Sequence, residues 1–131
     1  FLSQPRYDEL LWCCDVNFVR GEDSFVRAQW AERPLVWHIY PQSEGAHRLK
    51  LEAFLDLYVQ RLEPRAGAAL RAFWRPWNQP DAASVDMAGA WLEFWSHARA
   101  LTTHAVAWSE RVSQGGDLTV RLAQFARERV K

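Results

Sequence analysis

The chain has 131 residues, which suffice for one domain with a hydrophobic core but not for two domains of ordinary size. Its 16 basic and 16 acidic residues cancel, so neither nucleic acid nor an anionic membrane is expected as a partner. No signal peptide or membrane-spanning stretch is recognisable, and the two adjacent cysteines favour neither a disulfide nor a zinc site, so we expect a cytoplasmic protein without a metal.

The first third of the chain predicts a strand, a helix and a second strand. After a short helix with Pro5 in its first turn, residues 16–19 are rich in β-branched and aromatic side chains and predict a strand. Apolar spacing predicts a helix over 22–31, and the nearly continuous apolar run 35–39 predicts a strand buried on both faces. A unit of about 25 residues is the size of a tight β-α-β crossover, which makes the two strands parallel neighbours.

Everything after Pro41 is predicted to be helical. Apolar residues three and four apart predict four helices, over 49–62, 64–74, 87–112 and 118–131. The segment 78–84 predicts a loop with Ser84 as the N-cap of the long third helix, and Asp117 is the expected N-cap of the last one.

Two parallel strands cannot form a stable open sheet alone, because both faces and both edges of such a sheet need cover. We therefore expect further strands upstream of Phe1 and interpret the chain as the C-terminal, helix-rich part of a doubly wound α/β domain. Residues 1–131 form one predicted unit, in which 1–42 are the β-α-β segment and 43–131 the helical part of the same domain.

The stretch RGEDS, residues 20–24, stands where the first strand passes into the following helix. In parallel α/β sheets, ligands bind at this end of the strands, where unpaired N–H groups at a helix start can hold phosphate. Gly21 allows close approach to the backbone, and Arg20 offers a planar fork to a diphosphate. Tyr40, at the end of the second strand, adds an aromatic hydroxyl. The stretch predicts a nucleotide-phosphate pocket.

An acidic helix start is also typical of capping and of charge complementarity with the helix dipole, which leaves a purely structural role open. The side chains of Glu22 and Asp23 would repel a bare phosphate unless the ligand also carried hydroxyl groups for a carboxylate to bind. A nucleotide-sugar carries phosphate and hydroxyl groups together. We therefore interpret residues 1–42 as a nucleotide-sugar-binding segment.

The other candidate residues are better explained by packing. His38 lies in an apolar strand and is expected to be a core histidine, although a face shared with Tyr40 would bring it to the pocket. The remaining histidines lack the spacing of metal ligands. The helical spacing of Trp91, Trp95 and Trp108 predicts core positions, with a stacking surface for a ligand as the alternative.

The run DVNFVRGEDSFVRAQWA followed by PLVWHIYPQ strongly resembles the C-terminal half of the EarP family, bacterial protein-arginine rhamnosyltransferases that modify translation elongation factor P. The resemblance is dense over residues 1–62 and looser through the later helices. It implies the C-terminal, donor-binding part of a GT-B glycosyltransferase, which transfers rhamnose from dTDP-β-L-rhamnose to an arginine with inversion. It implies no metal and no cofactor.

The resemblance also implies a set of donor-binding residues in this chain: Phe1, Gln4, Tyr7, Arg20, Gly21, Glu22, Asp23, Ser24 and Tyr40. The N–H groups of Asp23 and Ser24, the Ser24 hydroxyl and Tyr40 would bind the diphosphate. Arg20 would neutralise it or hold the loop. Glu22 is the one side chain that the resemblance places in the catalytic site, facing hydroxyls of the sugar or the ribose.

Three further residues would lie at the thymine base. Gln4 matches a glutamine beside the base, and Phe1 a nearby aromatic residue. Tyr7 falls where family members commonly have phenylalanine; its ring can stack on the base, but its hydroxyl changes the geometry.

The aspartates that the family uses on the acceptor arginine belong to an N-terminal domain, which we expect to be missing upstream of Phe1. A guanidinium is a poor nucleophile because its lone pair is delocalised and its pKa lies above about 12. The fragment alone is therefore expected to be inactive. Two alternatives stay open: a helical protein-interaction module without catalysis, and a transferase that uses another nucleotide-sugar.

Overall fold

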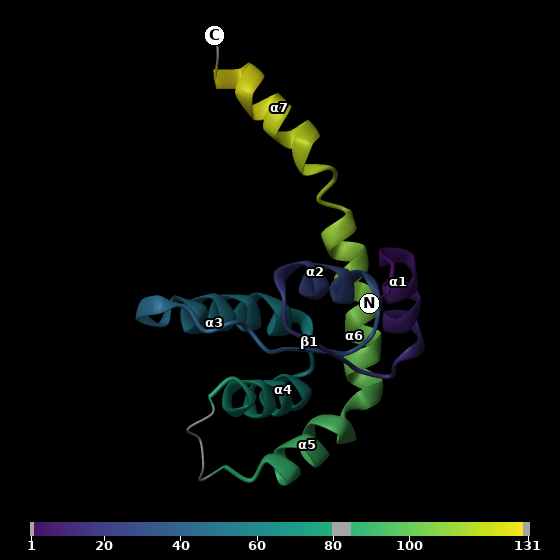
Figure 1. The fold of residues 1–131 in the computed structure, drawn as a ribbon, viewed down its shortest axis with the longest axis vertical. Coiled ribbons are helices and arrows are strands. Elements are labelled where there is room, and N and C mark those ends of the chain that lie inside the picture. Colours follow the sequence, from purple (N-terminus) through teal and green to yellow (C-terminus); the bar gives the residue numbers. More distant parts are fainter. Residues whose placement is uncertain (1, 80–84, 130–131) are drawn as a thin grey trace.

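The structure is a computed structural model that describes residues 2–79 and 85–129. Phe1 and Ser84, which have predicted roles, lie outside the described residues. The elements follow one another as α1 (Gln4–Cys13), β1 (Asn17–Val19), α2 (Glu22–Trp30), β2 (Leu35–Trp37), the 3₁₀ turn η1 (Ser43–Gly45), α3 (Ala46–Tyr58), the 3₁₀ turn η2 (Val59–Arg61), α4 (Pro64–Trp77), α5 (Met87–Ser96), α6 (Ala98–Ser113) and α7 (Leu118–Arg129). Figure 1 shows their arrangement.

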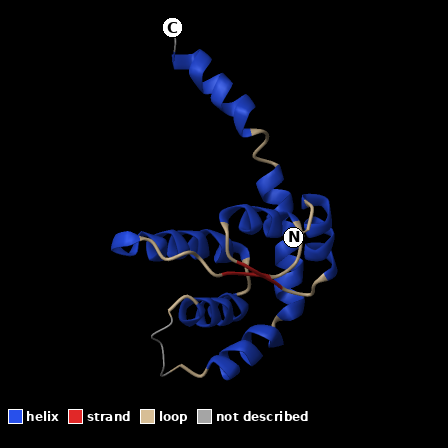
Figure 2. Cartoon of the chain, in the orientation of Figure 1, coloured by secondary structure: helices blue, strands red, loops and turns tan. Residues whose placement is uncertain are grey.

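The two strands are parallel and are joined by α2, as predicted, and they lie in the middle of the surrounding helices (Figure 2). Asn17 pairs with Leu35 and Val19 with Trp37. The second strand ends at Trp37, two residues before its predicted end. The reason is that the N–H of Ile39 donates to the side chain of Asn78, the residue directly after α4, rather than to a neighbouring strand. The predicted α/β class with a helix-rich remainder is confirmed.

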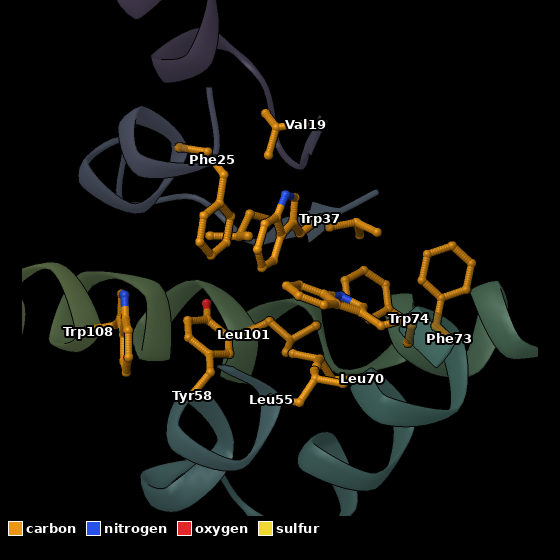
Figure 3. Packing of buried hydrophobic residues seen from close by; sticks show 14 of the residues in the cluster. Val19, Phe25, Trp37, Leu55, Tyr58, Leu70, Phe73, Trp74, Leu101 and Trp108 are labelled. Atoms are coloured by element: carbon orange, nitrogen blue, oxygen red, sulfur yellow. The ribbon is translucent and has the colours of Figure 1, made fainter. Parts of the chain in front are cut away.

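Aromatic side chains from four elements form the centre of the core (Figure 3). Phe25 of α2 stacks on Trp37 of β2, with ring centroids 3.9 Å apart and planes 12° from parallel. Phe54 of α3 meets both rings edge-on, and Trp74 of α4 stacks on Phe54 with centroids 6.0 Å apart. This stack holds α2, where the predicted site begins, against the strands and the helical layer.

The tryptophans divide between core and surface. Trp108 is buried, as predicted, and Trp91 is partly buried against the core. Trp95 is 37% exposed, so the prediction of a core position is wrong there. Its ring lies instead on that of Trp91, with centroids 5.6 Å apart.

The long helix predicted over 87–112 is two helices, α5 and α6, separated at His97. His97 leaves the helical conformation (φ −97°, ψ 14°), and the preceding Ser96 Oγ donates to the Glu93 carbonyl at 2.7 Å. The bend lets the two helices pack on different partners. Phe94 of α5 stacks on Phe73 of α4, whereas α6 lies against α3 and α2. Apolar spacing continues across the break, so the sequence pattern does not reveal it.

The last helix, α7, extends away from the rest of the molecule (Figure 1). Asp117 caps it as predicted, since its Oδ1 accepts hydrogen bonds from the N–H groups of Thr119 and Val120. All described residues of α7 are exposed, including the apolar side chains of Leu118 and Phe125. Within the described ranges, no helix combines the length and the apolar character needed to cross a membrane.

Candidate functional site

The RGEDS stretch forms the turn between β1 and α2. The indole Nε1 of Trp37 donates to the carbonyl oxygen of Arg20 at 3.0 Å, which ties the turn to β2. Gly21 is the N-cap of α2 in an extended conformation. Its carbonyl oxygen accepts hydrogen bonds from the N–H of Phe25 at 2.9 Å and from the hydroxyl of Ser24 at 2.8 Å. The turn is therefore held to β2 through Arg20 and to the first residues of α2 through Gly21.

The backbone N–H groups of Glu22, Asp23 and Ser24 form no hydrogen bond with any described residue. They are the first N–H groups of a nine-residue helix, which carry partial positive charge. Such a helix start can hold an anionic oxygen without any further change in backbone conformation.

Tyr40 lies beside this helix start although 15 residues separate it from Ser24 in the sequence. The guanidinium carbon of Arg20 is 4.6 Å from the centroid of the Tyr40 ring. A Cβ atom added to Gly21 would lie 3.6 Å from Ser24 Oγ and 3.9 Å from the Tyr40 ring. The fold thus brings Arg20, Gly21, Ser24 and Tyr40 together, as the sequence predicted.

The two carboxylates of the turn have different surroundings. Asp23 accepts a hydrogen bond from Nε of Arg27 at 3.0 Å, and Nη1 of the same arginine reaches both carboxylate oxygens of Asp8 at 2.9 Å. These hydrogen bonds, that to Asp8 first and that to Asp23 second, raise the pKa of Arg27. Glu22 is exposed and forms no ion pair within the described part of the chain. Only the charge of Asp23 is compensated by the protein itself.

The helix α1 approaches the site from a second side. The Asp8–Arg27 ion pair holds α1 against α2. Gln4 is exposed at the start of α1, one turn before Asp8 on the same face, and Tyr7 packs partly against the core. No hydrogen bond connects Gln4 or Tyr7 with residues 20–24 in the described structure. Their predicted place at a thymine base stays a prediction.

His38 lies next to the site but is engaged in packing. Its ring meets the edge of Trp77, with centroids 6.2 Å apart, and it is half-buried. Burial first, and the charge of Arg20 second, lower its pKa. His38 therefore stays neutral near pH 7, in agreement with the packing role that its apolar strand favours.

Asn78 is a positioning residue that the sequence did not indicate. Its Oδ1 accepts a hydrogen bond from the N–H of Ile39 at 2.9 Å, and its Nδ2 donates to the carbonyl oxygens of Trp37 and Trp74. These bonds hold the chain immediately before Tyr40 against the end of α4. The only signal in the sequence is an asparagine that opens the predicted loop 78–84, and that signal does not identify a partner.

Comparisons with known proteins identify the family of this chain. The family model "Elongation-Factor P (EF-P) rhamnosyltransferase EarP" matches residues 1–127. The protein-arginine rhamnosyltransferase of Pseudomonas aeruginosa is 50% identical over 95% of this chain, which spans 32% of that protein. That of Shewanella oneidensis is 41% identical over 96% of this chain, which spans 31% of it.

A solved structure gives the same result in three dimensions. It is described as the structural basis for EarP-mediated arginine glycosylation of translation elongation factor EF-P. It superimposes with a TM-score of 0.80 at 46% identity over 98% of this chain, which covers 39% of that chain. The chain thus spans about a third of its relatives, and it belongs to the EarP family of elongation factor P rhamnosyltransferases.

Proposed function

We propose that this chain binds dTDP-β-L-rhamnose for an enzyme that transfers rhamnose, with inversion, to an arginine of elongation factor P. Membership of the EarP family and relatives named protein-arginine rhamnosyltransferases support the reaction class. The solved structure similar to this chain concerns arginine glycosylation of EF-P. For this chain, the identities of the donor nucleotide and of the acceptor protein are parts of the proposal.

The observation that carries the proposal is the cluster of Arg20, Gly21, Ser24 and Tyr40 around the unpaired N–H groups of α2. A diphosphate placed there would accept hydrogen bonds from those N–H groups and would lie next to the Arg20 guanidinium. Ser24 Oγ now donates to the Gly21 carbonyl, so its hydroxyl would have to turn to reach a phosphate oxygen. We place the diphosphate on residues 20–24 and Tyr40.

Glu22 is assigned to the hydroxyl groups of the donor. It is exposed beside the helix start and lacks an ion-pair partner within the described ranges, so its carboxylate is available to accept hydrogen bonds. A carboxylate that binds sugar hydroxyls offsets its repulsion of the diphosphate, whereas Asp23 already pairs with Arg27, which it shares with Asp8. Glu22 is therefore the residue of this chain that we place in the catalytic site.

The acceptor arginine needs carboxylates that orient it and withdraw a proton as the C–N bond forms, because the free guanidinium is a weak nucleophile. We propose that these acids lie in another domain of a GT-B enzyme and that residues 1–131 alone bind donor without transferring rhamnose. Residues 1–42 hold the donor, and 43–131 support them as part of the same domain. No metal or cofactor takes part in the proposed reaction.

Calorimetry on the full-length protein tests the donor assignment. We expect dTDP-rhamnose to bind more tightly than UDP-sugars, and Ser24→Ala to weaken binding by about tenfold, the value of one charged hydrogen bond. Ser113→Ala is the matched control, because Ser113 Oγ also donates to a backbone carbonyl, at 2.7 Å, but lies on α6. Equal affinity of Ser24→Ala and the unmodified protein would overturn the diphosphate site, and preference for a UDP-sugar would overturn the donor.

The alternative of a helical interaction module is favoured by α7, whose apolar side chains are exposed. If α7 binds a partner and the RGEDS turn is only a helix cap, changing Leu122 and Phe125 to Asp should abolish partner binding and Glu22→Ala should change no ligand affinity. The donor proposal predicts the opposite result for Glu22.

A further inference from the structure

A second concave site lies along α6, where this helix passes the connection between α3 and α4. The groove has a volume of about 560 Å³ and is lined by residues 61–63 and by one face of the segment 96–111. Buried Trp108 and Leu62 form part of its wall. This volume falls within the range of about 300–1,000 Å³ found for small-molecule sites.

Three arginines, Arg61, Arg99 and Arg111, line the groove. None of them forms an ion pair with a described carboxylate, although exposed Glu63 also lines the groove. By contrast, Arg27, Arg71 and Arg75, which lie between helices elsewhere in the described structure, each have an acidic partner. Three guanidinium groups and one carboxylate thus line the groove, which gives it an excess of positive charge.

The arginines also affect one another. Burial first, and the charge of Arg61 second, lower the pKa of Arg111. The Arg111 guanidinium lies over the Trp108 ring, 4.5 Å from its centroid, which fixes it at the groove wall. An anion between Arg61 and Arg111 would remove their repulsion and would meet, at Arg111, a guanidinium group that has already lost part of its hydration.

Two polar atoms of the groove residues are buried without a hydrogen-bond partner among the described residues: His104 Nε2 and Arg111 Nη2. His104 is only 6% exposed, and the edge of its ring packs on Tyr58 with centroids 4.7 Å apart. Native proteins contain few such unpaired polar atoms, and the cost of burying them is commonly offset at a functional site. Both atoms belong to residues of the groove wall and keep unused hydrogen-bonding capacity among the described residues.

We propose that this groove binds a small organic anion, with its carboxylate or phosphate held by Arg61 and Arg111 and its apolar body against Leu62 and Trp108. A guanidinium group binds the paired anionic oxygens of a carboxylate or of a phosphate. We therefore expect the groove to recognise this anionic group rather than one particular head group. The apolar wall selects against bare inorganic anions, which gain nothing from it.

The groove is separate from the proposed donor site. None of its lining residues belongs to residues 1–42. The donor residues lie at the start of α2, whereas Gln29 near the end of α2 accepts a hydrogen bond from Trp108 Nε1 at 2.9 Å. The two ends of this nine-residue helix lie roughly 13 Å apart.

Four probes test the proposal on the full-length protein. They differ in whether they carry an anionic group, an aromatic body or both. The probes are 1-naphthyl phosphate, 1-naphthoate, 1-naphthol and inorganic phosphate, titrated with saturating dTDP present so that the donor site is occupied. Binding is followed by calorimetry and by the NMR signal of the Trp108 indole N–H, which is assigned with Trp108→Phe. At least one of the two naphthyl anions should bind. 1-Naphthol and inorganic phosphate should bind at least about tenfold more weakly.

Variants decide whether binding takes place in the groove. Arg61→Gln and Arg111→Gln should each weaken the binding of the naphthyl anions by about tenfold. Arg127→Gln, on exposed α7, should leave this affinity unchanged. Arg61 is exposed and packs on no ring, so its variant stays informative if Arg111→Gln unfolds the helix. Absence of binding, equal binding of 1-naphthol, or undiminished binding by Arg61→Gln would overturn the proposal while dTDP binding remains intact.

Discussion

The guanidinium of Arg20 lies over the ring of Tyr40, 4.6 Å from its centroid. The two residues come from the ends of neighbouring parallel strands, and both side chains are exposed. The contact can serve the proposed donor site in two ways. The ring can position Arg20 for the diphosphate, or the Tyr40 hydroxyl can bind the diphosphate itself.

Two variants of Tyr40 separate these roles. If the hydroxyl binds the diphosphate, Tyr40→Phe should weaken the binding of dTDP by about tenfold. If the ring only positions Arg20, Tyr40→Phe should have no effect and Tyr40→Leu should weaken dTDP by a smaller factor, because a cation–π contact at an exposed site contributes about 0.5–1 kcal/mol. Calorimetry with dTDP measures both. Unchanged affinity in both variants would remove Tyr40 from the site.

The unequal surroundings of Glu22 and Asp23 lead to a second prediction. If the carboxylate binds the sugar, Glu22→Gln should weaken the binding of dTDP-rhamnose by about tenfold and leave the affinity for dTDP unchanged. If it binds the ribose, the variant should weaken the binding of both ligands equally. Asp23→Asn serves as the matched control, because Asp23 already bonds to Arg27. Calorimetry with the two ligands distinguishes the cases. A larger effect of Asp23→Asn than of Glu22→Gln would reverse the assignment of the two acids.

The β-α-β unit could be predicted because its signals are local. A strand of β-branched and aromatic residues, a glycine and an apolar run between Pro34 and Pro41 each indicate their own structure without reference to distant residues. The grouping of Arg20 with Tyr40 could be predicted for the same reason, since strand topology alone places the two residues side by side.

The features that could not be predicted depend on contacts between distant residues. Asn78 bonds to Trp37 and Ile39, which lie 41 and 39 residues away. Likewise, the break at His97 results from the different partners of α5 and α6, and apolar spacing is the same on both sides of it. Positions such as these are set by tertiary packing, to which local propensity is only a weak guide.

Asn78 supplies a stability prediction. Asn78→Ala would leave the Ile39 N–H and the Trp37 carbonyl unpaired in a part-buried region, so we expect a loss of about 2–3 kcal/mol in unfolding free energy. Urea unfolding of the full-length protein, followed by tryptophan fluorescence, measures it. Gln79→Ala, at the exposed neighbouring residue, should change little. A stable Asn78→Ala variant with normal dTDP affinity would show that the clamp before Tyr40 is dispensable.

The ion pair between α3 and α4 predicts a pH dependence of stability. Arg75 Nε and Nη2 donate to the two carboxylate oxygens of Glu52 at 2.8 and 2.7 Å. These hydrogen bonds are the largest cause of the lowered pKa of Glu52. Because the folded protein keeps Glu52 ionised at a lower pH than the unfolded chain does, the stabilisation is complete near neutral pH. It is lost as the pH falls through about 5 to 3.

Both partners of this pair are more than a third exposed, so the effect should stay below about 1 kcal/mol. Urea unfolding of the full-length protein at pH 7 and at pH values down to about 3.5 should show a smaller loss of stability for Glu52→Gln than for the unmodified protein. Glu128→Gln, on exposed α7, removes a carboxylate that forms no described ion pair and should follow the unmodified protein at every pH. If Glu52→Gln loses stability on acidification as steeply as the unmodified protein, the α3–α4 ion pair does not contribute to acid sensitivity.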